Sequence, residues 1–363
     1  MKEVLHLITT ICMGGAEKQL ITLIKEQVNS GRKVSVLYLK GMPELEDAIL
    51  ESGAALIKGF SNQNPVIQFY RIRRHLSKNK ETIVHAHLPR AELATLFLHR
   101  NTTVVVTRHN AEKFFPKAPI ILSRILSKMV VSRTSRVIAI SEAVKNFLID
   151  SREVVEVSKI QVVYYGFATY VSKSIIRDEK VESLRSFDFL IGTVARLVPQ
   201  KDLETLIKAF AIFVQQKRES KLVIVGDGYL KRNLINLSKQ LGISDEIIWF
   251  GRTKDIPAVI RTMDIFALTS LYEGFGLVLL EAMSEGVPIV ASRNSAIPEV
   301  LGEEYEGLFE TGNETILASL FSKVSDPKVS SRIIHYLGQR IEMFEPHRMR
   351  EEIDAIYSSL EIT

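Results

Sequence analysis

Short apolar, β-branched segments alternate with amphipathic stretches along almost the whole chain. We expect strands at Val4–Thr9, Val34–Tyr38, Thr82–Ala86, Thr103–Val106, Val137–Ile140, Ile160–Val163, Phe189–Val194, Leu222–Val225, Ile247–Phe250, Ile265–Leu268 and Ile289–Ala291. The helical period of 3.6 residues marks, among others, Ala16–Val28, Lys201–Gln215, Leu230–Leu241 and Ile316–Val324. Strands that alternate with helices in this way predict parallel sheets covered by helices on both faces, an α/β fold.

One polar stretch interrupts this alternation. Residues 167–187 are rich in charge and lack strand character, and the alternation restarts at Phe189. Because 363 residues exceed one ordinary α/β core, we predict two Rossmann-like domains, residues 1–168 and 187–345, with this segment as the linker. A last amphipathic helix lies within residues 346–363 and is expected to pack back on the first domain. Ligands bind at the carboxyl ends of parallel strands, so two facing sheets predict a cleft.

Composition narrows the class of protein. The single cysteine, Cys12, excludes an intrachain disulfide and a cysteine zinc cage, which favours a reducing, cytoplasmic setting. The N-terminus reads as a first strand rather than a signal peptide, and no apolar run approaches the ~18–20 residues that span a bilayer. The net charge of +5 is uneven, since residues 1–166 hold 24 Lys or Arg against 14 Asp or Glu. The first half is therefore expected to face something anionic.

The strongest chemical signal follows the strand Ile265–Leu268, in the text SLYEGFGLVLLEA. Glu273 would stand at the carboxyl end of the strand, and the backbone N–H groups from about Phe275 to Val278 would open a helix and bind an anion or hydroxyl. Glu281 would lie roughly 12 Å further along a continuous helix. Two carboxylates so placed suit a long polyol ligand, with one carboxylate binding each end. They suit a pair of glycosidase carboxylates less well, because those lie about 5–9.5 Å apart. A loop glutamate and a solvated helix glutamate remain the alternative.

Further signals follow three other predicted strands. Arg196 and Lys201 place two cations beside a helix N-terminus, where a diphosphate can bind, although a surface arginine and a helix-start lysine are the alternative. Gly226 and Gly228 indicate a tight turn rather than a phosphate cradle. Backbone groups near Thr253 would read the edge of a base.

These motifs together resemble glycosyltransferase family 4, the retaining enzymes of GT-B fold. The resemblance covers nearly the whole chain, is densest between Ile191 and Val300, and includes the EGFG core and the IPEV text. It implies that Glu273 binds hydroxyls of the transferred sugar, that Glu281 binds the ribose, and that Arg196 and Lys201 hold the diphosphate. The donor site so implied comprises Gly15, Arg196, Lys201, Gly226, Thr253, Glu273, Gly274, Phe275, Gly276, Leu277 and Glu281.

In the first domain the family likeness rests on two places. Gly14 and Gly15, in the GGAE text, resemble a loop that borders the phosphates or the acceptor, although a plain strand-to-helix turn explains them equally well. His109 resembles the histidine near the donor sugar and joins Glu273, Arg196 and Lys201 as a candidate catalytic residue; His87 is a second candidate for a similar place.

Three positions depart from the family pattern. Asp202 stands where the family usually has glycine, Tyr165 where it commonly has asparagine, and Asn294-Ser295-Ala296 in place of a glycine pair before IPE. We expect both cations to stay in place and the base side to differ in detail.

The sequence favours neither a bound metal nor a thiol nucleophile. His85 and His87 would share one face of a strand, but the sequence indicates no third ligand. GT-B enzymes generally need no bound metal, so no cofactor is expected. His6, with His75, His99, His335 and His347, is interpreted as structural or surface-exposed, and nothing orients Cys12 as a nucleophile.

The basic residues of the first half form two groups: Arg71, Arg73, Arg74, Lys78 and Lys80, and then Lys117, Arg124, Lys128, Arg133 and Arg136. Apolar residues interleave the second group, which fits a helix docked on anionic lipid or an ordinary helix with a solvated side. No nucleic-acid-binding module is recognised.

The sequence therefore predicts a retaining glycosyltransferase. It would move a sugar from an NDP-sugar, with UDP favoured, to a glycan or lipid-linked acceptor in polysaccharide or glycolipid biosynthesis. It would be cytoplasmic or peripheral on the inner face of the membrane. The alternatives are a nucleotide-sugar epimerase of the same fold and a non-catalytic binding subunit.

Overall fold

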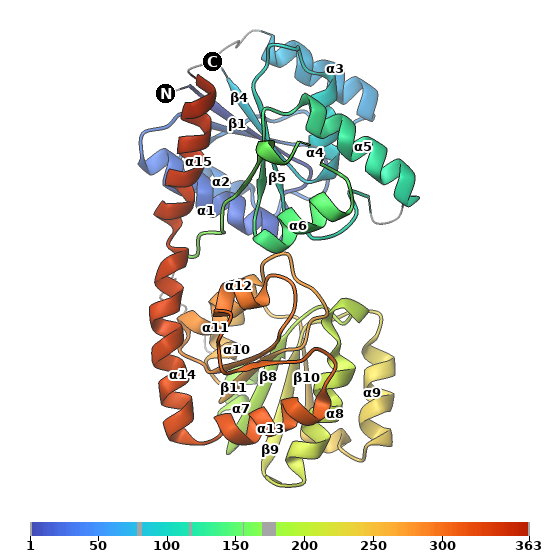
Figure 1. Cartoon of the computed structure of the whole chain (residues 1–363), viewed down its shortest axis with the longest axis vertical. Coiled ribbons are helices and arrows are strands. Elements are labelled where there is room, and N and C mark those ends of the chain that lie inside the picture. The colour runs from blue at the N-terminus through green and yellow to red at the C-terminus, as the bar shows by residue number, and fades with distance from the viewer. Residues whose placement is uncertain (1, 78–81, 116–117, 155, 169–178, 362–363) are drawn as a thin grey trace. The chain divides into compact units, whose positions relative to one another are not determined.

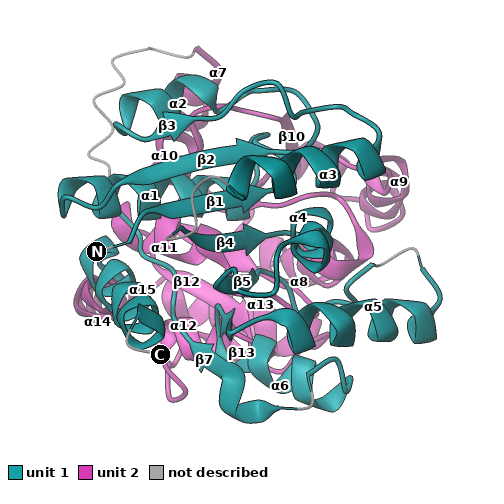
Figure 2. Cartoon of the chain, turned by 90° about the horizontal axis from the view of Figure 1, so that it is seen from above, with its two compact units in different colours: residues 1–168, 344–363 teal, residues 169–343 magenta. Residues whose placement is uncertain are grey.

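The computed structural model describes residues 2–77, 82–115, 118–154, 156–168 and 179–361. The chain divides into two compact units (Figures 1 and 2). Unit 1 comprises residues 1–168 and 344–363, and unit 2 comprises residues 169–343. Of the segment expected to be a linker, residues 169–178 lie outside the described part, and helix α7 (Glu179–Leu184) belongs to unit 2.

Unit 1 is built on a seven-stranded parallel sheet with the order β3-β2-β1-β4-β5-β6-β7. Its strands are β1 (Val4–Ile8), β2 (Val34–Tyr38), β3 (Ala55–Leu56), β4 (Ile83–His87), β5 (Val104–Arg108), β6 (Arg136–Ala139) and β7 (Ile160–Val162). Its helices are α1 (Gly15–Asn29), α2 (Glu46–Glu51), α3 (Pro65–Leu76), α4 (Pro89–Ala94), η1 (Thr95–Phe97), α5 (Ile120–Arg133), α6 (Glu142–Asp150), η2 (Val157–Lys159) and α15 (Pro346–Glu361).

The central strands of unit 1 explain why the sequence pattern could be read. Every residue of β1, β2, β4 and β5 is buried, because helices cover both faces of the sheet, and such strands carry nearly continuous apolar runs. The three buried histidines of β1 and β4, His6, His85 and His87, are exceptions to the apolar rule. The order of the sheet reverses between β1 and β4, which is where open α/β sheets bind ligands.

Unit 2 repeats the design with a six-stranded parallel sheet of order β10-β9-β8-β11-β12-β13. Its strands are β8 (Phe189–Val194), β9 (Ser220–Val225), β10 (Ile247–Gly251), β11 (Ile265–Leu268), β12 (Ile289–Ser292) and β13 (Leu308–Phe309). Its further helices are η3 (Pro199–Lys201), α8 (Leu203–Val214), α9 (Lys231–Gln240), η4 (Ser244–Glu246), α10 (Ile256–Ile260), α11 (Leu277–Ser284), α12 (Ile297–Leu301), α13 (Glu314–Val324) and α14 (Pro327–Arg340), followed by η5 (Ile341–Phe344). The order of this sheet reverses between β8 and β11, and we call such a reversal the switch point of the sheet.

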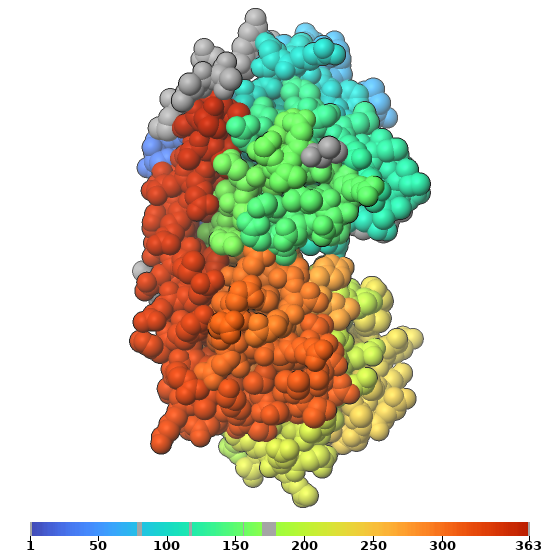
Figure 3. Space-filling model, in the orientation of Figure 1, coloured from blue at the N-terminus to red at the C-terminus, as the bar shows by residue number. Residues whose placement is uncertain are grey.

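The last helix, α15, lies against α1 and is held to unit 1 by buried polar contacts. Figure 3 shows it in red along the side of unit 1. Asp354 accepts an ion pair from Arg32 at 3.0 Å, and the arginine side chain is 1% exposed. The Tyr357 hydroxyl lies 2.6 Å from Nδ1 of His85 on β4. The backbone N–H of Lys2 donates to Glu361 at 2.9 Å, so the first strand and the last helix meet.

We expect Asp354→Ala to lower the free energy of unfolding of unit 1 by about 3 to 5 kcal/mol, because it leaves the Arg32 guanidinium buried beside only the more distant Glu361. Glu351→Ala, on the same helix, is the control: its side chain is 60% exposed, and its pair with Arg350 contributes less than about 1 kcal/mol. Urea unfolding followed by circular dichroism measures both. Equal losses in the two variants would show that the ion pair does not anchor α15.

Candidate functional site

The clearest polar arrangement in unit 2 joins the two loops that flank its switch point. Lys201, in the loop after β8, places Nζ 2.5 Å from Oε1 of Glu273, in the loop after β11. Both side chains are largely buried, with exposed fractions of 13% and 10%. Ser270 donates to the same carboxylate oxygen at 2.7 Å. The structure thus brings together two of the residues that the sequence singled out 72 positions apart.

Backbone contacts hold these two loops in register. Gln200 donates from Nε2 to the carbonyl of Tyr272 at 2.9 Å, and its own carbonyl accepts from Leu271 N at 2.8 Å. Thr269 donates to the carbonyl of Lys201 at 2.9 Å. Each of these three hydrogen bonds ends on a main-chain carbonyl, so the loop that carries Lys201 is held against the loop that carries Glu273.

Arg196 lies at the mouth of the same loop and is exposed. Its Nη2 donates a long hydrogen bond to Oε1 of Gln200 at 3.3 Å. An exposed guanidinium beside a half-buried ammonium forms a positive edge at the carboxyl end of β8, where a phosphate group would find donors.

Helix α11 begins within the range that the sequence indicated. Gly276 caps it at φ +89°, Leu277 is its first residue, and Phe275 is buried at 2% exposure. Glu273 therefore precedes the helix, and the expectation of a continuous helix from Glu273 to Glu281 is wrong. Within α11, Glu281 lies about 6 Å along the helix axis from the first residue, Leu277. Glu281 is partly buried on this helix, one turn after its start, and Gly274 lies in the loop before it.

The glycine turn after β9 packs against the arginine loop. Gly226 has φ +131°, and a Cβ atom there would lie 2.0 Å from the carbonyl oxygen of Ala195. A Cβ on Gly228 would lie 2.4 Å from the carbonyl oxygen of Leu197. Leu197 N donates in turn to the carbonyl of Asp227 at 3.0 Å. The glycines are needed so that two backbones can approach around Arg196, which agrees with the tight-turn interpretation.

The segment after β10 supplies a second edge of this surface. Thr253 accepts from the backbone N–H of Asp255 at 3.1 Å through its hydroxyl, and Gly226 N donates to the carbonyl of Gly251 at 2.8 Å. Thr253 thus stands after the strand next to β9, on the same carboxyl edge as Arg196 and Glu273.

Two departures from the family pattern adopt the backbone conformation that glycine favours. Asp202 has φ +43° and Ser295 has φ +53°. The Asp202 carboxylate accepts from the Thr205 hydroxyl at 2.7 Å, and the Ser295 hydroxyl donates to the backbone carbonyl of Glu273 at 2.7 Å. The local turns are therefore kept without glycine, and Ser295 adds a direct support to the Glu273 loop.

In unit 1, Gly15 is the first residue of α1 and follows the turn after β1. The Glu17 carboxylate folds back over this turn, 2.3 Å from the position that a Cβ on Gly14 would take, and accepts from the Thr10 hydroxyl at 2.6 Å. A side chain at position 14 would force this carboxylate away.

His109 follows β5, and both of its ring nitrogens have partners inside unit 1. Nε2 lies 3.1 Å from Nδ1 of His87, and Nδ1 is hydrogen-bonded to the hydroxyl of Tyr165. Burial lowers the pKa of His109 to about 3, so the ring is neutral at physiological pH. A ligand that hydrogen-bonds to this ring has to replace one of these two partners.

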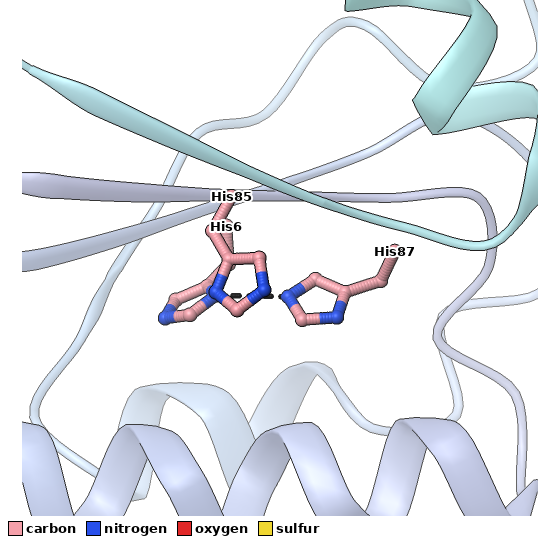
Figure 4. Close-up of side chains that lie close together, drawn as sticks. All are labelled: His6, His85 and His87. Carbon is pink, nitrogen blue, oxygen red and sulfur yellow. Dashed lines mark hydrogen bonds between the residues drawn. The ribbon is translucent and has the colours of Figure 1, made fainter. Parts of the chain in front are cut away.

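His6 joins His85 and His87 in a cluster in which one ring nitrogen of each histidine lies within 4.8 Å of the other two (Figure 4). The expectation that His85 and His87 have no third histidine beside them is wrong, because the pairing of β1 with β4 brings the buried His6 there. Three imidazoles so close are a donor set that a metal ion accepts. Each of the six ring nitrogens, however, already has a hydrogen-bond partner in the described part of unit 1.

Several contributors lie outside what sequence reasoning found. Ser270 and Ser295 lie in segments that the sequence singled out, but their hydrogen bonds to Glu273, and that of Gln200 to the neighbouring Tyr272, depend on the fold. Tyr165 departs from the family pattern, and the structure gives its hydroxyl a partner, Nδ1 of His109.

Two family models match the chain almost end to end. The model described as Glycosyltransferase Family 4 matches residues 13–169, and the model described as Glycosyl transferases group 1 matches residues 175–337. An Escherichia coli protein, UDP-Gal:alpha-D-GlcNAc-diphosphoundecaprenol alpha-1,3-galactosyltransferase, is 27% identical over 278 residues, which are 73% of this chain and 70% of that protein. The capsular polysaccharide biosynthesis glycosyltransferase CapM of Staphylococcus aureus is 26% identical over 297 residues, or 78% of each.

Solved structures confirm the predicted fold class. Anabaena HepE in complex with UDP-glucose superposes with a TM-score of 0.80 at 22% identity, over 99% of this chain and 100% of that one. The two parallel sheets with flanking helices are thus the two Rossmann-like domains of a GT-B fold.

We expect Gly226→Ala to destabilise unit 2 by at least about 2 kcal/mol, because the new Cβ collides with the Ala195 carbonyl and the backbone is in a region that L residues avoid. Gly242→Ala serves as the control, since it has φ +72° but no atom within 4 Å of the added Cβ, and it is expected to cost about 1 kcal/mol. Thermal unfolding of both variants tests this. Similar losses would mean that the close approach at Gly226 is not required.

Proposed function

The chain belongs to glycosyltransferase family 4, and we propose that it moves a sugar from a UDP-sugar to a glycan or lipid-linked acceptor, with retention of configuration. The observation that carries the proposal is the pairing of Lys201 with Glu273 at the switch point of unit 2. It joins a cation for the diphosphate to a carboxylate for the sugar, in the loops where α/β sheets bind ligands.

UDP is favoured as the nucleotide because of the names that similar proteins carry. The Escherichia coli relative is named for UDP-Gal, and HepE was solved with UDP and with UDP-glucose. In this proposal Glu281 binds the ribose hydroxyls, the backbone near Thr253 contacts the base, and the residues from Gly274 to Leu277 line the sugar and phosphate side.

Breaking the bond between the sugar and the diphosphate leaves negative charge on the departing phosphate and positive charge on the sugar. Arg196 and Lys201, with the N-terminus of α11, would stabilise the phosphate charge. When the diphosphate attracts Lys201, Glu273 becomes available to sugar hydroxyls. Attack on the same face, assisted by the leaving phosphate, accounts for retention without a separate base, and we propose that no metal is needed.

Unit 1 is the proposed acceptor domain. His109 and the turn at Gly15 lie at the carboxyl edge of its sheet, near the switch point. The names of the relatives include a diphosphoundecaprenol acceptor and capsular polysaccharide, which supports a role in polysaccharide or glycolipid assembly.

The reported relatives are named glycosyltransferases, and none supports the epimerase alternative. A non-catalytic binding subunit remains testable, since it would bind nucleotide without transferring sugar.

Unit 1 also carries a surface that suits an anionic membrane. The helices α3 and α5 contain no acidic residue, and η1 packs against both of them. Their exposed apolar side chains, together with that of η1, are Val66, Ile67, Tyr70, Phe97, Ile120, Ile121, Leu122, Ile125 and Met129. The exposed basic residues beside them are Arg71, Arg73, Arg74 and Lys128. Of the basic residues expected here, Lys78, Lys80 and Lys117 lie outside the described residues.

The described helices include none that is both long enough and apolar enough to cross a bilayer. We propose instead that the α3–η1–α5 surface rests on anionic lipid at the inner face of the cytoplasmic membrane, with apolar side chains in the interface and arginines at the headgroups. Arg133 is not part of this contact, because it donates to the carbonyls of His99 and Thr102.

A thermal-shift titration with UDP, GDP, ADP and CDP, without added metal, tests the donor site. UDP at roughly 100 times its dissociation constant should stabilise the protein by about 2.7 kcal/mol. Lys201→Ala should abolish the ligand-induced rise, whereas Lys208→Ala, an exposed lysine on the next helix, should keep it.

Lys201→Ala also leaves Glu273 without its cation, so its melting temperature without ligand is expected to fall; the rise on adding UDP is the quantity to compare. No response of the wild type to any nucleotide would contradict the donor site. A response without sugar transfer to any acceptor would favour the binding subunit.

Vesicle co-sedimentation tests the membrane surface. The wild type should bind phosphatidylglycerol vesicles more strongly than phosphatidylcholine vesicles, and added salt should weaken the binding. The triple variant Ile121→Ser, Ile125→Ser, Met129→Ser should lose most of it.

The control replaces three similarly apolar surface residues of unit 2 by serine, Ile212, Leu241 and Ile316, and should bind as the wild type does. Equal binding of both triple variants, or no preference for anionic lipid, would rule out this surface.

A further inference from the structure

A chain of buried hydrogen bonds runs through unit 1 and ends at His109. His109 Nε2 lies 3.1 Å from His87 Nδ1, His87 Nε2 lies 3.0 Å from His6 Nδ1, and His6 Nε2 lies 2.8 Å from Oε1 of Gln27. At the other end the Tyr165 hydroxyl contacts His109 Nδ1. His6, His87 and Gln27 are at most 2% exposed, so water cannot replace these contacts.

Every imidazole in this chain is neutral. Burial lowers the pKa of His6 to about 4 and that of His109 to about 3, and it holds the pKa of His87 well below its usual range. Burial also raises the pKa of Tyr165, so the phenol keeps its proton. Each neutral ring has one N–H and one lone pair, and therefore donates one hydrogen bond and accepts one.

One end then sets the direction of the whole chain. The Gln27 carbonyl oxygen only accepts, so His6 carries its proton on Nε2 and accepts at Nδ1 from His87. His87 carries its proton on Nε2 and accepts at Nδ1 from His109. His109 must therefore carry its proton on Nε2, and its Nδ1 accepts from the hydroxyl of Tyr165.

The alternative for this cluster is a metal ion held by His6, His85 and His87. His85 does not belong to the chain: its Nδ1 contacts the Tyr357 hydroxyl and its Nε2 the Thr107 hydroxyl, each at 2.6 Å. An ion bound by all three rings would have to displace at least one bond of the chain and one of His85. The hydrogen-bonded arrangement uses all six nitrogens without such a loss.

A small cavity lies beside the end of the chain. Its volume is about 20 Å³, and its lining includes His87, His109, Tyr165 and Gln19. This volume admits one water molecule or one hydroxyl group. Oε1 of Gln19 is buried there without a hydrogen-bond partner among the described residues. An occupant that donates a hydrogen bond fits this site.

We propose that Gln27, His6 and His87 are positioning residues that fix the tautomer of His109, so that its Nδ1 is an acceptor for a hydroxyl that displaces the phenol of Tyr165. Resting on the proposed function, the ligand is a hydroxyl of the acceptor, which we assign to unit 1. The chain is not a route for protons out of the site, because it ends on an amide oxygen that does not take up a proton.

The test is nitrogen-15 NMR of histidine-labelled full-length protein at pH 7.5, which reports the tautomer of each ring. We expect His6, His87 and His109 to carry their protons on Nε2. Gln27→Leu removes the acceptor that sets the direction, so a second tautomer of His109 should appear. Tyr165→Phe should leave the tautomer unchanged, because the direction is set at the opposite end.

Thr107→Val is the matched control, since Thr107 is also buried and its hydroxyl is hydrogen-bonded to His85, which lies outside the chain of hydrogen bonds. It should leave the His109 tautomer as in the wild type. A proton on Nδ1 of any of the three chain histidines in the wild type would overturn the proposal, as would stoichiometric Zn²⁺ binding that shifts their nitrogen resonances. If Gln27→Leu does not fold, the histidine tautomers of the wild type and of Tyr165→Phe still test the proposal.

The UDP titration of Gln27→Leu separates this proposal from the proposed function. Gln27 lies in unit 1, so UDP should stabilise the variant as it stabilises the wild type. If UDP binding is unchanged but a chain histidine of the wild type carries its proton on Nδ1, only the positioning role is contradicted. If the three histidines carry their protons on Nε2 but the protein binds no nucleotide, the donor site is contradicted and the proposed chain of hydrogen bonds is not.

Discussion

The close contact between Lys201 and Glu273 is the constraint on which the candidate donor site depends. A buried carboxylate needs a cation or hydrogen-bond donors nearby. Lys201 reaches Glu273 from the loop after the neighbouring strand, and Ser270 donates from the same loop as Glu273. That neighbour exists because the order of the sheet reverses between β8 and β11. The same reversal leaves the ends of both loops facing an open edge, where the positive charge of Arg196 adds to that of Lys201. The electrostatics of the site therefore follow from sheet topology.

Much of the fold could be predicted because strands buried on both faces leave apolar runs in the sequence. All eleven expected strands are present, and the two that were missed, β3 and β13, are edge strands of two residues, too short to make a pattern. The donor motifs could be recognised because they lie within short continuous segments. A continuous helix from Glu273 to Glu281 was wrongly expected, because periodicity does not reveal the positive φ of Gly276, which precedes the first residue of α11.

Contacts between distant segments were not readable from one sequence. His6 and His87 are 81 positions apart, and only the pairing of β1 with β4 brings them together. Asp202 and Ser295 raised doubt as departures from glycine, yet both accept the left-handed backbone and make a side-chain hydrogen bond that glycine lacks. The family pattern thus tolerates a change of residue where the backbone conformation is kept.

A crystal structure of the protein with UDP tests the central claim most directly. The account predicts that the phosphate oxygens lie within hydrogen-bonding distance of Arg196 and Lys201, with the ribose hydroxyls on Glu281. UDP bound away from the carboxyl edge of the unit 2 sheet, with Lys201 still paired only with Glu273, would contradict it.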